Sequence, residues 1–297
     1  MTMDQGRLEE RWRSFSGPAN IYEVDMAVDP LDDIIGLARQ AGLDRAADAT
    51  AWHEAGPLLE VEQEPYVCTV YRPSRAVQVV DTSRWQVDDG ANLEISDAEA
   101  TEAATREAER LGLFGDDAFA PFRVTRLHVA SAERGRPAGD ERVIDVGVVF
   151  TRRLDGLSFE GQGGNIVMYL GSDGRLTGFE RVSRRIAGVR EAVGDWRGLE
   201  EVLSEVEGYW RLRRGEGLDV EDARLGYLEL GRLQEQEVIQ PVYVLGLRLA
   251  GGGSGSAPPD ADRRIEHVVP AATNRVGTLM PVAEYPSPAP GRRHSAD

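Results

Sequence analysis

The sequence contains no lysine, and all 34 of its basic residues are arginine. Without lysine no Schiff base to the protein can form, so pyridoxal phosphate enzymes and lysine aldolases are excluded. A Walker A motif is excluded for the same reason. Recognition of an anionic group would therefore depend on arginine, whose planar guanidinium can hold a carboxylate through two hydrogen bonds.

Cysteine and histidine are also scarce. The single cysteine, Cys68, excludes an intrachain disulfide and any CxxC metal site, and its place in the alternating run YVCTVY predicts a buried, unreactive thiol. The four histidines, His53, His128, His267 and His294, show no HxH or HxxxH spacing. The sequence therefore predicts neither a metal nor a cofactor.

No apolar run approaches the roughly 20 residues of a membrane span, and the N-terminus lacks a signal-peptide core. A cytoplasmic, soluble protein is expected. The formal net charge of −17 opposes binding to nucleic acid or to anionic membranes through bulk attraction. Neither a nucleic acid nor a membrane is an expected partner.

A helix and then a strand-rich segment are predicted in the first part of the chain. Asp29 and Pro30 are typical of a helix N-terminus, and Gly42 of a helix end. Short alternating runs then indicate strands at LLEVEQ, YVCTVYR and AVQVVDT. Ser96 and Glu99 have the spacing of a capping box, so an alanine-rich helix is expected to follow and to end at Gly112.

The order of a helix followed by strands then recurs. Strands are expected at VTRLHVA, VIDVGVVFTRRL, GNIVMYL and LTGFERV, a helix over 195–212, and further strands at ARLGYLEL, VIQPVYVLGLRL and RRIEHVVPA. The Gly/Ser/Pro-rich segment 250–262 indicates a flexible hairpin tip, and the tail after Pro286 indicates disorder. Neither segment is expected to carry function.

The glycine-rich stretch RRLDGLSFEGQGGNIVMYLGSDGRLTGFERV resembles PepSY-type modules and the two-module YycI and YycH regulatory proteins. The resemblance extends from Leu58 to Ala272, and it includes the later QPVYV and VVPA runs. It implies an α+β fold with two helix-plus-antiparallel-sheet repeats after an N-terminal helical segment. The expected parts are that segment at 1–57, a first repeat at 58–190, a second repeat at 191–285, and a disordered tail at 286–297.

Phosphate binding by this glycine-rich stretch is disfavoured, because a phosphate loop leads into a helix and this one leads into a strand. Asp155-Gly156 and Asp173-Gly174 are better explained as hairpin turns, and the glycines from Gly161 to Gly164 as a bend. The stretch therefore indicates the fold and leaves the functional site elsewhere.

An arginine beside aromatic residues is the strongest candidate for a site. Tyr71 and Arg72 end a strand and Trp85 follows, which suits a planar anionic ligand held by a guanidinium and by stacked rings. An ordinary surface arginine beside a core tryptophan would give the same sequence pattern. Arg126 and His128 share one strand face and form a second candidate pair, or an ordinary solvent-facing one. The nearest candidate general bases are Asp88, Asp89 and Glu94.

Two functions fit these observations. The first is a protein that binds a small aromatic or anionic molecule and catalyses a cofactor-independent condensation or cyclisation in bacterial specialised metabolism, for example of the Pictet–Spengler type. The second is a non-catalytic regulator or inhibitor that binds another protein through a sheet edge, as the resemblance implies. Exposed sheet edges also allow a homodimer.

Overall fold

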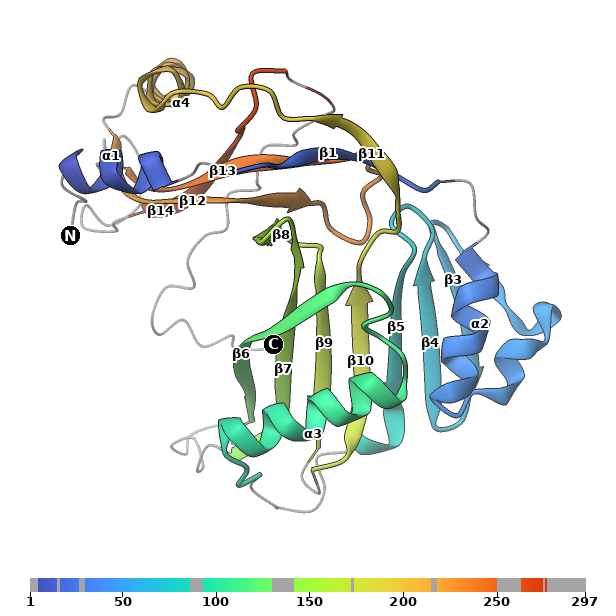
Figure 1. Cartoon of the computed structure of the whole chain (residues 1–297). Helices are drawn as coiled ribbons and strands as arrows, with labels where there is room; N and C mark the ends of the chain where they lie inside the picture. Colours follow the sequence, from blue (N-terminus) through green and yellow to red (C-terminus); the bar gives the residue numbers. More distant parts are fainter. Residues whose placement is uncertain are drawn as a thin grey trace. The chain divides into compact units, whose positions relative to one another are not determined.

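Helices and antiparallel strands form two compact units in the computed structural model of the chain (Figure 1). The structure describes residues 5–14, 17–26, 30–85, 93–129, 142–171, 174–214, 218–249, 263–274 and 276. Unit 1 takes in Met1–Glu23, Gly188–Tyr227 and Val238–Asp297, and unit 2 takes in Val24–Ala187 and Leu228–Glu237. The expected α+β class is confirmed.

The described elements are named here in chain order. The helices are α1 (Gln5–Ser14), α2 (Pro30–Gln40), α3 (Asp97–Arg110) and α4 (Leu199–Arg214), with short 3-10 turns η1 (Asp44–Ala47), η2 (Ala49–Ala51) and η3 (Thr82–Trp85). The strands are β1 (Asn20–Val24), β2 (His53–Ala55), β3 (Leu58–Gln63), β4 (Tyr66–Tyr71), β5 (Ala76–Asp81), β6 (Ala118–Val129), β7 (Arg142–Leu154), β8 (Leu157–Gly161), β9 (Asn165–Leu170), β10 (Leu176–Val182), β11 (Ile186–Ala192), β12 (Leu218–Glu229), β13 (Val238–Leu249) and β14 (Arg263–Pro270).

Unit 2 is built on one antiparallel sheet with helices on one face. Its strands follow the order β8-β7-β9-β10-β5-β4-β3-β2, and β6 pairs with β7. Figure 1 shows α3 crossing in front of β7, β9 and β10, with α2 beside β3 and β4. The buried side chains of α2 and α3 belong to the same apolar cluster as one face of this sheet.

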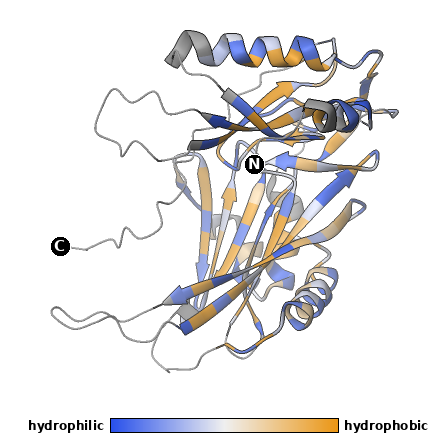
Figure 2. Ribbon diagram, turned by 90° about the vertical axis from the view of Figure 1, so that its left-hand side faces the viewer, coloured by the Kyte–Doolittle hydropathy of each residue, from blue (hydrophilic) through white to orange (hydrophobic). Residues whose placement is uncertain are grey.

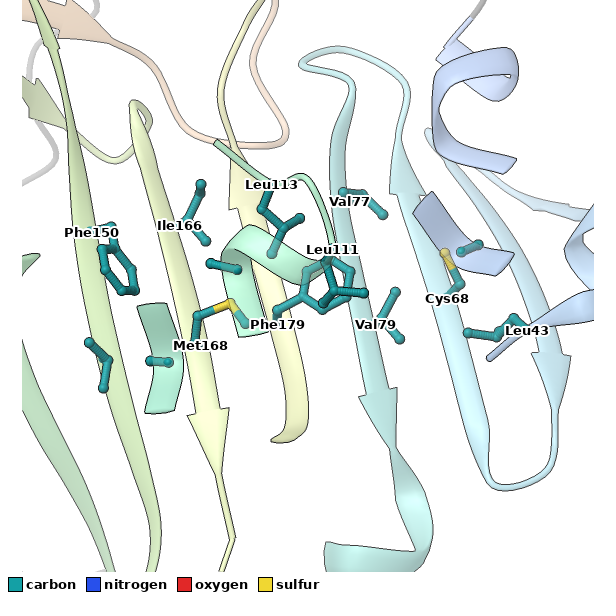
Figure 3. Packing of buried hydrophobic residues seen from close by; sticks show 14 of the residues in the cluster. Leu43, Cys68, Val77, Val79, Leu111, Leu113, Phe150, Ile166, Met168 and Phe179 are labelled. Carbon is teal, nitrogen blue, oxygen red and sulfur yellow. The ribbon is translucent and has the colours of Figure 1, made fainter. Parts of the chain in front are cut away.

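The core of unit 2 contains a row of apolar side chains that crosses the sheet. Cross-strand partners in this row run from β3 to β6 as Val61, Cys68, Val79, Phe179, Met168, Val148 and Val124. Figure 3 shows several of them packed together with Leu111 and Leu113, which follow α3. Burial raises the pKa of the Cys68 thiol to about 12, which fits the expected unreactive thiol.

The ends of the two helices in unit 2 agree with the sequence. Ser96 and Glu99 form the capping box at the start of α3, where each side chain accepts a hydrogen bond from the other residue's backbone N–H. Gly42 follows α2 and Gly112 follows α3, both with positive φ (102° and 64°). Positive φ suits glycine after a helix, so both predicted helix ends are confirmed.

A two-residue turn joins β7 to β8 as the sequence predicts. Asp155 and Gly156 have φ of 50° and 78°, and the strands pair at Leu154 and Leu157 on either side. Positive φ at both central residues is the type I′ geometry that hairpins prefer. Of the second predicted turn, Asp173 lies outside the described residues, as do segment 250–262 and the tail after Pro286.

Unit 1 has its own sheet and its own core. Its strands follow the order β11-β1-β13-β12, and β14 pairs with β13. Side chains of α1 and α4 pack on this sheet, with Trp12 against the ring of Tyr243 and Val202, Val206 and Trp210 buried beside them. Figure 2 shows hydrophilic and hydrophobic patches together on α4, as expected for a helix with one buried side.

Three elements of unit 1, α1, β1 and β11, were not predicted one by one, although a helical segment was expected over 1–57. The first two lie in the segment before residue 30, where the sequence shows no long periodic pattern. Across the described residues, none of the helices is long and apolar enough to span a membrane.

Candidate functional site

The sheet of unit 2 carries polar side chains on the face opposite its core. Alternate residues of a strand point to opposite faces, so the neighbours of the core row form a second row on the other side. Its first four members are Glu60, Thr69, Gln78 and Glu180, which are cross-strand partners in adjacent strands. We call these four residues the polar row, and their side of the sheet the opposite face.

The side chains of the polar row bond to each other and to their neighbours. The Thr69 hydroxyl donates to Oε1 of Glu60 over 3.2 Å, and the other oxygen of Glu60 lies 3.5 Å from Nε2 of His53. The Tyr71 hydroxyl donates to Oε1 of Gln78 over 3.2 Å. Thr69 and Tyr71 are buried, so these two neighbouring hydrogen bonds are partly desolvated.

Arg232 reaches the polar row from the connection between β12 and β13, residues 230–237. Its NH1 lies 2.8 Å from Oε1 of Glu180, and its guanidinium carbon lies 4.8 Å from the centre of the Tyr71 ring. The Glu180 side chain is 15% exposed and that of Arg232 is 42% exposed. The arginine thus remains accessible to solvent while the carboxylate is mostly covered.

The 230–237 connection is fixed by a buried arginine. Arg184 donates from NH1 to the carbonyl oxygen of Leu230 over 2.7 Å, and from NH2 to those of Gly231 and Gln234. These carbonyls flank Arg232 on both sides, so Arg184 determines where Arg232 can reach. The Ser74 hydroxyl adds a bond of 2.7 Å to the Arg232 carbonyl.

A buried ionic cluster supports Arg184. Glu229 has no exposed surface, and its Oε1 accepts from the backbone N–H of Arg184 at 2.7 Å and lies 3.4 Å from NH1 of Arg184. Its Oε2 lies 3.7 Å from NH1 of Arg152, which also pairs with Asp117 at 2.6 Å and stacks over Phe159. Burial raises the pKa of Glu229, and the two guanidinium groups oppose that shift. The cluster is a structural support for the site.

The glycine-rich bend makes room for this support. A Cβ on Gly163 would lie 2.5 Å from the carbonyl oxygen of Leu230, and one on Gly161 would lie 2.7 Å from that of Glu229. The backbone N–H of Gly163 donates to the same Glu229 carbonyl over 2.9 Å. These glycines therefore let the backbone of residues 229–230 approach closely.

Tyr169 and Asp145 extend the opposite face beyond the polar row. Tyr169 has two glycines, Gly147 and Gly178, as cross-strand partners, and its ring packs over Gly147, where an added Cβ would lie 3.6 Å from the ring. Burial raises the pKa of Tyr169, and the charges of Glu180 and Asp145 add to the effect. Its hydroxyl is therefore protonated at neutral pH and can donate a hydrogen bond.

Asp145 is the described acid of this face that is best suited to proton transfer near neutral pH. Burial raises its pKa to about 6, although the backbone of Val146 and Leu170 opposes the shift. The Thr177 hydroxyl lies close enough to stabilise the carboxylate, yet neither Oδ1 of Asp145 nor Oγ1 of Thr177 has a hydrogen bond of good geometry. Thr177 is only 4% exposed.

We expect Asp145→Asn to stabilise the protein by about 1–2 kcal/mol at pH 8, allowing for partial exposure of the carboxyl group. Below its ordinary pKa of 3.8, Asp145 is protonated in both the folded and the unfolded chain. Between 3.8 and about 6 only the unfolded chain releases the proton, so stability falls as the pH rises and the cost persists above that range. Urea unfolding at pH 8 and at pH 4 measures the difference, which should shrink at pH 4.

The control for this variant is Asp116→Asn, at an exposed turn position. It should change stability by less than about 0.5 kcal/mol at either pH. A stabilisation by Asp145→Asn of the same size at pH 4 and pH 8 would show that the carboxyl group is not the cause.

The structure does not bring together the residues of the first predicted site, the one built on Tyr71 and Arg72. Tyr71 lies on the opposite face, but Arg72 lies in the turn after β4 and pairs with Glu54 of β2. Trp85 ends η3, and its side chain is not described. Asp88 and Asp89 lie outside the described residues.

The other predicted residues lie near α3 or on β6. Glu94 is exposed and borders a hollow of about 460 Å³, whose lining is Leu93, Glu94, Ile95, Glu99, Glu102, Ala103, Arg106 and Gly174. Arg126 pairs with Asp97 at the start of α3 and donates to the carbonyl of Ile95. His128 is exposed on the same strand. In the described ranges, no three His, Cys, Asp or Glu side chains are arranged to hold a metal.

Sequence reasoning missed Arg232, Glu180 and Asp145. The alternation of LTGFERV did contain a signal for Glu180, because Phe179 belongs to the core row and its neighbour must point the other way. No local pattern marks Arg232, which meets Tyr71 across about 160 residues of sequence only through the fold.

Comparison with known proteins adds no family. No protein-family model matches the chain, and no curated protein matches it. Among solved structures, an uncharacterized protein from Eubacterium rectale ATCC 33656 matches with 12% identity and a TM-score of 0.47, covering 89% of this chain and 86% of that one.

Proposed function

We propose that unit 2 binds a small organic molecule on the opposite face, with Arg232 and Glu180 as the two charged contacts. The observation that carries this proposal is the position of Arg232, which stacks on Tyr71 and pairs with Glu180 at the edge of the polar row. Positioned, partly desolvated groups of opposite charge beside aromatic rings are typical of sites that orient small ligands.

The charges of the site favour a ligand with both an amine and a carboxylate. Arg232 can donate two parallel hydrogen bonds to a carboxylate, and the carboxylates of Glu180 and Glu60 can bind an ammonium group. Beside them lie half-buried apolar side chains, Val167 and Tyr169, on which a ring can rest. The sequence also allowed a purely anionic ligand. Such a ligand would be repelled by the two carboxylates of the polar row and by the protein's net charge of −17.

The catalytic form of this proposal is a cofactor-independent condensation of the Pictet–Spengler type. An arylethylamine and an aldehyde would take up a proton and lose water to form an iminium ion, and the ring carbon would then attack this ion and release a proton. With a pKa of about 6, Asp145 is suited to giving and taking that proton near neutral pH. Neither step requires an oxidant or a metal.

We expect calorimetry at pH 7 to rank three related probes in a defined order. L-tryptophan carries a ring, an amine and a carboxylate, tryptamine lacks the carboxylate, and indole-3-propionate lacks the amine. Arg232→Ala should weaken the affinity for L-tryptophan by about tenfold and leave the affinity for tryptamine unchanged. Glu180→Gln should weaken the affinities for tryptamine and L-tryptophan and leave the affinity for indole-3-propionate unchanged.

The control is Arg72→Ala, which removes the arginine that the sequence favours as anchor. It should leave all three affinities unchanged, because Arg72 lies in the turn after β4 beside Glu54 of β2, whereas Arg232 is the arginine that pairs with Glu180 in the polar row. The proposal is wrong if no probe binds at millimolar concentration, or if Arg72→Ala has the larger effect. Incubation of tryptamine with an aldehyde, followed by mass spectrometry, tests the catalytic form separately, since binding can persist without turnover.

A further inference from the structure

A basic strand edge lies at the end of the unit 2 sheet. In the part of the chain that the structure describes, β6 pairs only with β7, so its other side presents backbone N–H and C=O groups for pairing. The strand has 12 residues, and its exposed side chains include Phe122 (67%) and Leu127 (56%). Such an edge can accept an added strand from another chain.

The charge of β6 is opposite to that of the protein. The sequence AFAPFRVTRLHV contains Arg123, Arg126 and His128 and no acidic residue, whereas the whole chain has a net charge of −17. Arg123 is exposed and stacks near Phe122, with its guanidinium carbon 5.9 Å from the ring centre. A second copy of β6 would bring the same positive charges, so self-pairing is disfavoured.

The geometry of β6 limits the length of such an added strand. Pairing with β7 is regular from Arg123 to Leu127, and the register shifts on both sides of that stretch. Pro121 also removes one donor near its start. Bulges and proline are features that protect exposed edges from unselective pairing. About five residues therefore remain available for selective pairing.

We propose that the edge of β6 from Arg123 to Leu127 binds an extended acidic segment of a partner protein by antiparallel or parallel strand addition. Backbone hydrogen bonds would supply the affinity, and the charge of the exposed Arg123 would select acidic side chains, whereas Arg126 is already paired with Asp97. Leu127, exposed on the opposite face, would contact an apolar residue of the partner. This surface is separate from the polar row.

The test compares two synthetic peptides on the full-length protein by fluorescence anisotropy at low salt. One alternates valine with glutamate and the other alternates valine with lysine. Bulk attraction to a protein of charge −17 favours the lysine peptide, so a preference for the glutamate peptide must come from a local surface. We expect the glutamate peptide to bind at least tenfold more tightly, and Arg123→Glu to abolish that preference.

Hydrogen exchange measured by mass spectrometry provides the second readout. The glutamate peptide should protect amides within residues 123–127, and the same peptide with a central proline should not. The proposal is overturned if the lysine peptide binds equally or better, or if protection falls elsewhere. It is also overturned if the free protein is a dimer in which these amides are already protected, because a second copy would then occupy the edge.

Discussion

Replacing Glu229 with alanine is expected to destabilise unit 2 by about 3–5 kcal/mol. The carboxylate is fully buried, and it neutralises Arg184 and Arg152, each of which is only 2% exposed. Its removal takes away the counter-charge of Arg184 in a low-dielectric interior and leaves Arg152 with Asp117 as its acidic partner, a much larger penalty than the loss of a surface ion pair. Urea unfolding monitored by circular dichroism measures the change.

Two further variants separate charge from packing. Glu229→Gln keeps an acceptor for the backbone N–H of Arg184 and should lose less stability than the alanine variant. Glu235→Ala alters an exposed residue of the same 230–237 connection and should stay within about 0.5 kcal/mol of the wild type. A loss of under 1 kcal/mol for Glu229→Ala would mean that the buried cluster does not support the connection as described.

Gly163→Ala is expected to cost about 2–3 kcal/mol, although it adds only one methyl group. The new Cβ would lie 2.5 Å from the carbonyl oxygen of Leu230 and 2.7 Å from Cγ of Glu229. Because the nearer atom belongs to the backbone, no rotation of a side chain relieves the clash. The variant should also weaken ligand binding, because Arg232 lies on the displaced connection.

The matched control is Gly36→Ala, in the same unit. Gly36 lies in α2 with nothing within 4 Å of an added Cβ. Alanine there should stabilise the protein by about 0.5–1 kcal/mol, because it favours the helix more than glycine does. Opposite signs for these two glycine-to-alanine variants are the expected result. Equal effects would contradict the close approach at Gly163.

Local chemistry made much of the fold predictable. The capping box at Ser96, the type I′ turn at Asp155 and the helix end at Gly42 depend on residues close in sequence, and each has the expected geometry. The bend at Gly161 to Gly164 was also expected. The close approach that requires these glycines could not be predicted, because it involves the end of β12, more than 60 residues later in the chain.

The candidate site was less predictable, because its residues come together only through long-range pairing. Glu60 and Thr69 belong to neighbouring strands, but their link to Glu180 depends on β10 lying beside β5. Hydrophobic alternation indicates which residues share a face of one strand, and it does not give the order of strands in a sheet. Tyr71 was identified because aromatic residues next to arginine are recognisable locally, although the arginine that stacks on it is Arg232 and not Arg72.

Hydrogen exchange of the full-length protein with and without L-tryptophan tests most directly whether a small ligand binds on the opposite face of unit 2. We expect added protection in β5, β9 and β10 and in residues 230–237, and less protection in Arg232→Ala at the same concentration of L-tryptophan. Protection confined to α3 and the hollow beside Glu94, or no protection at a saturating millimolar concentration, would contradict binding on this face.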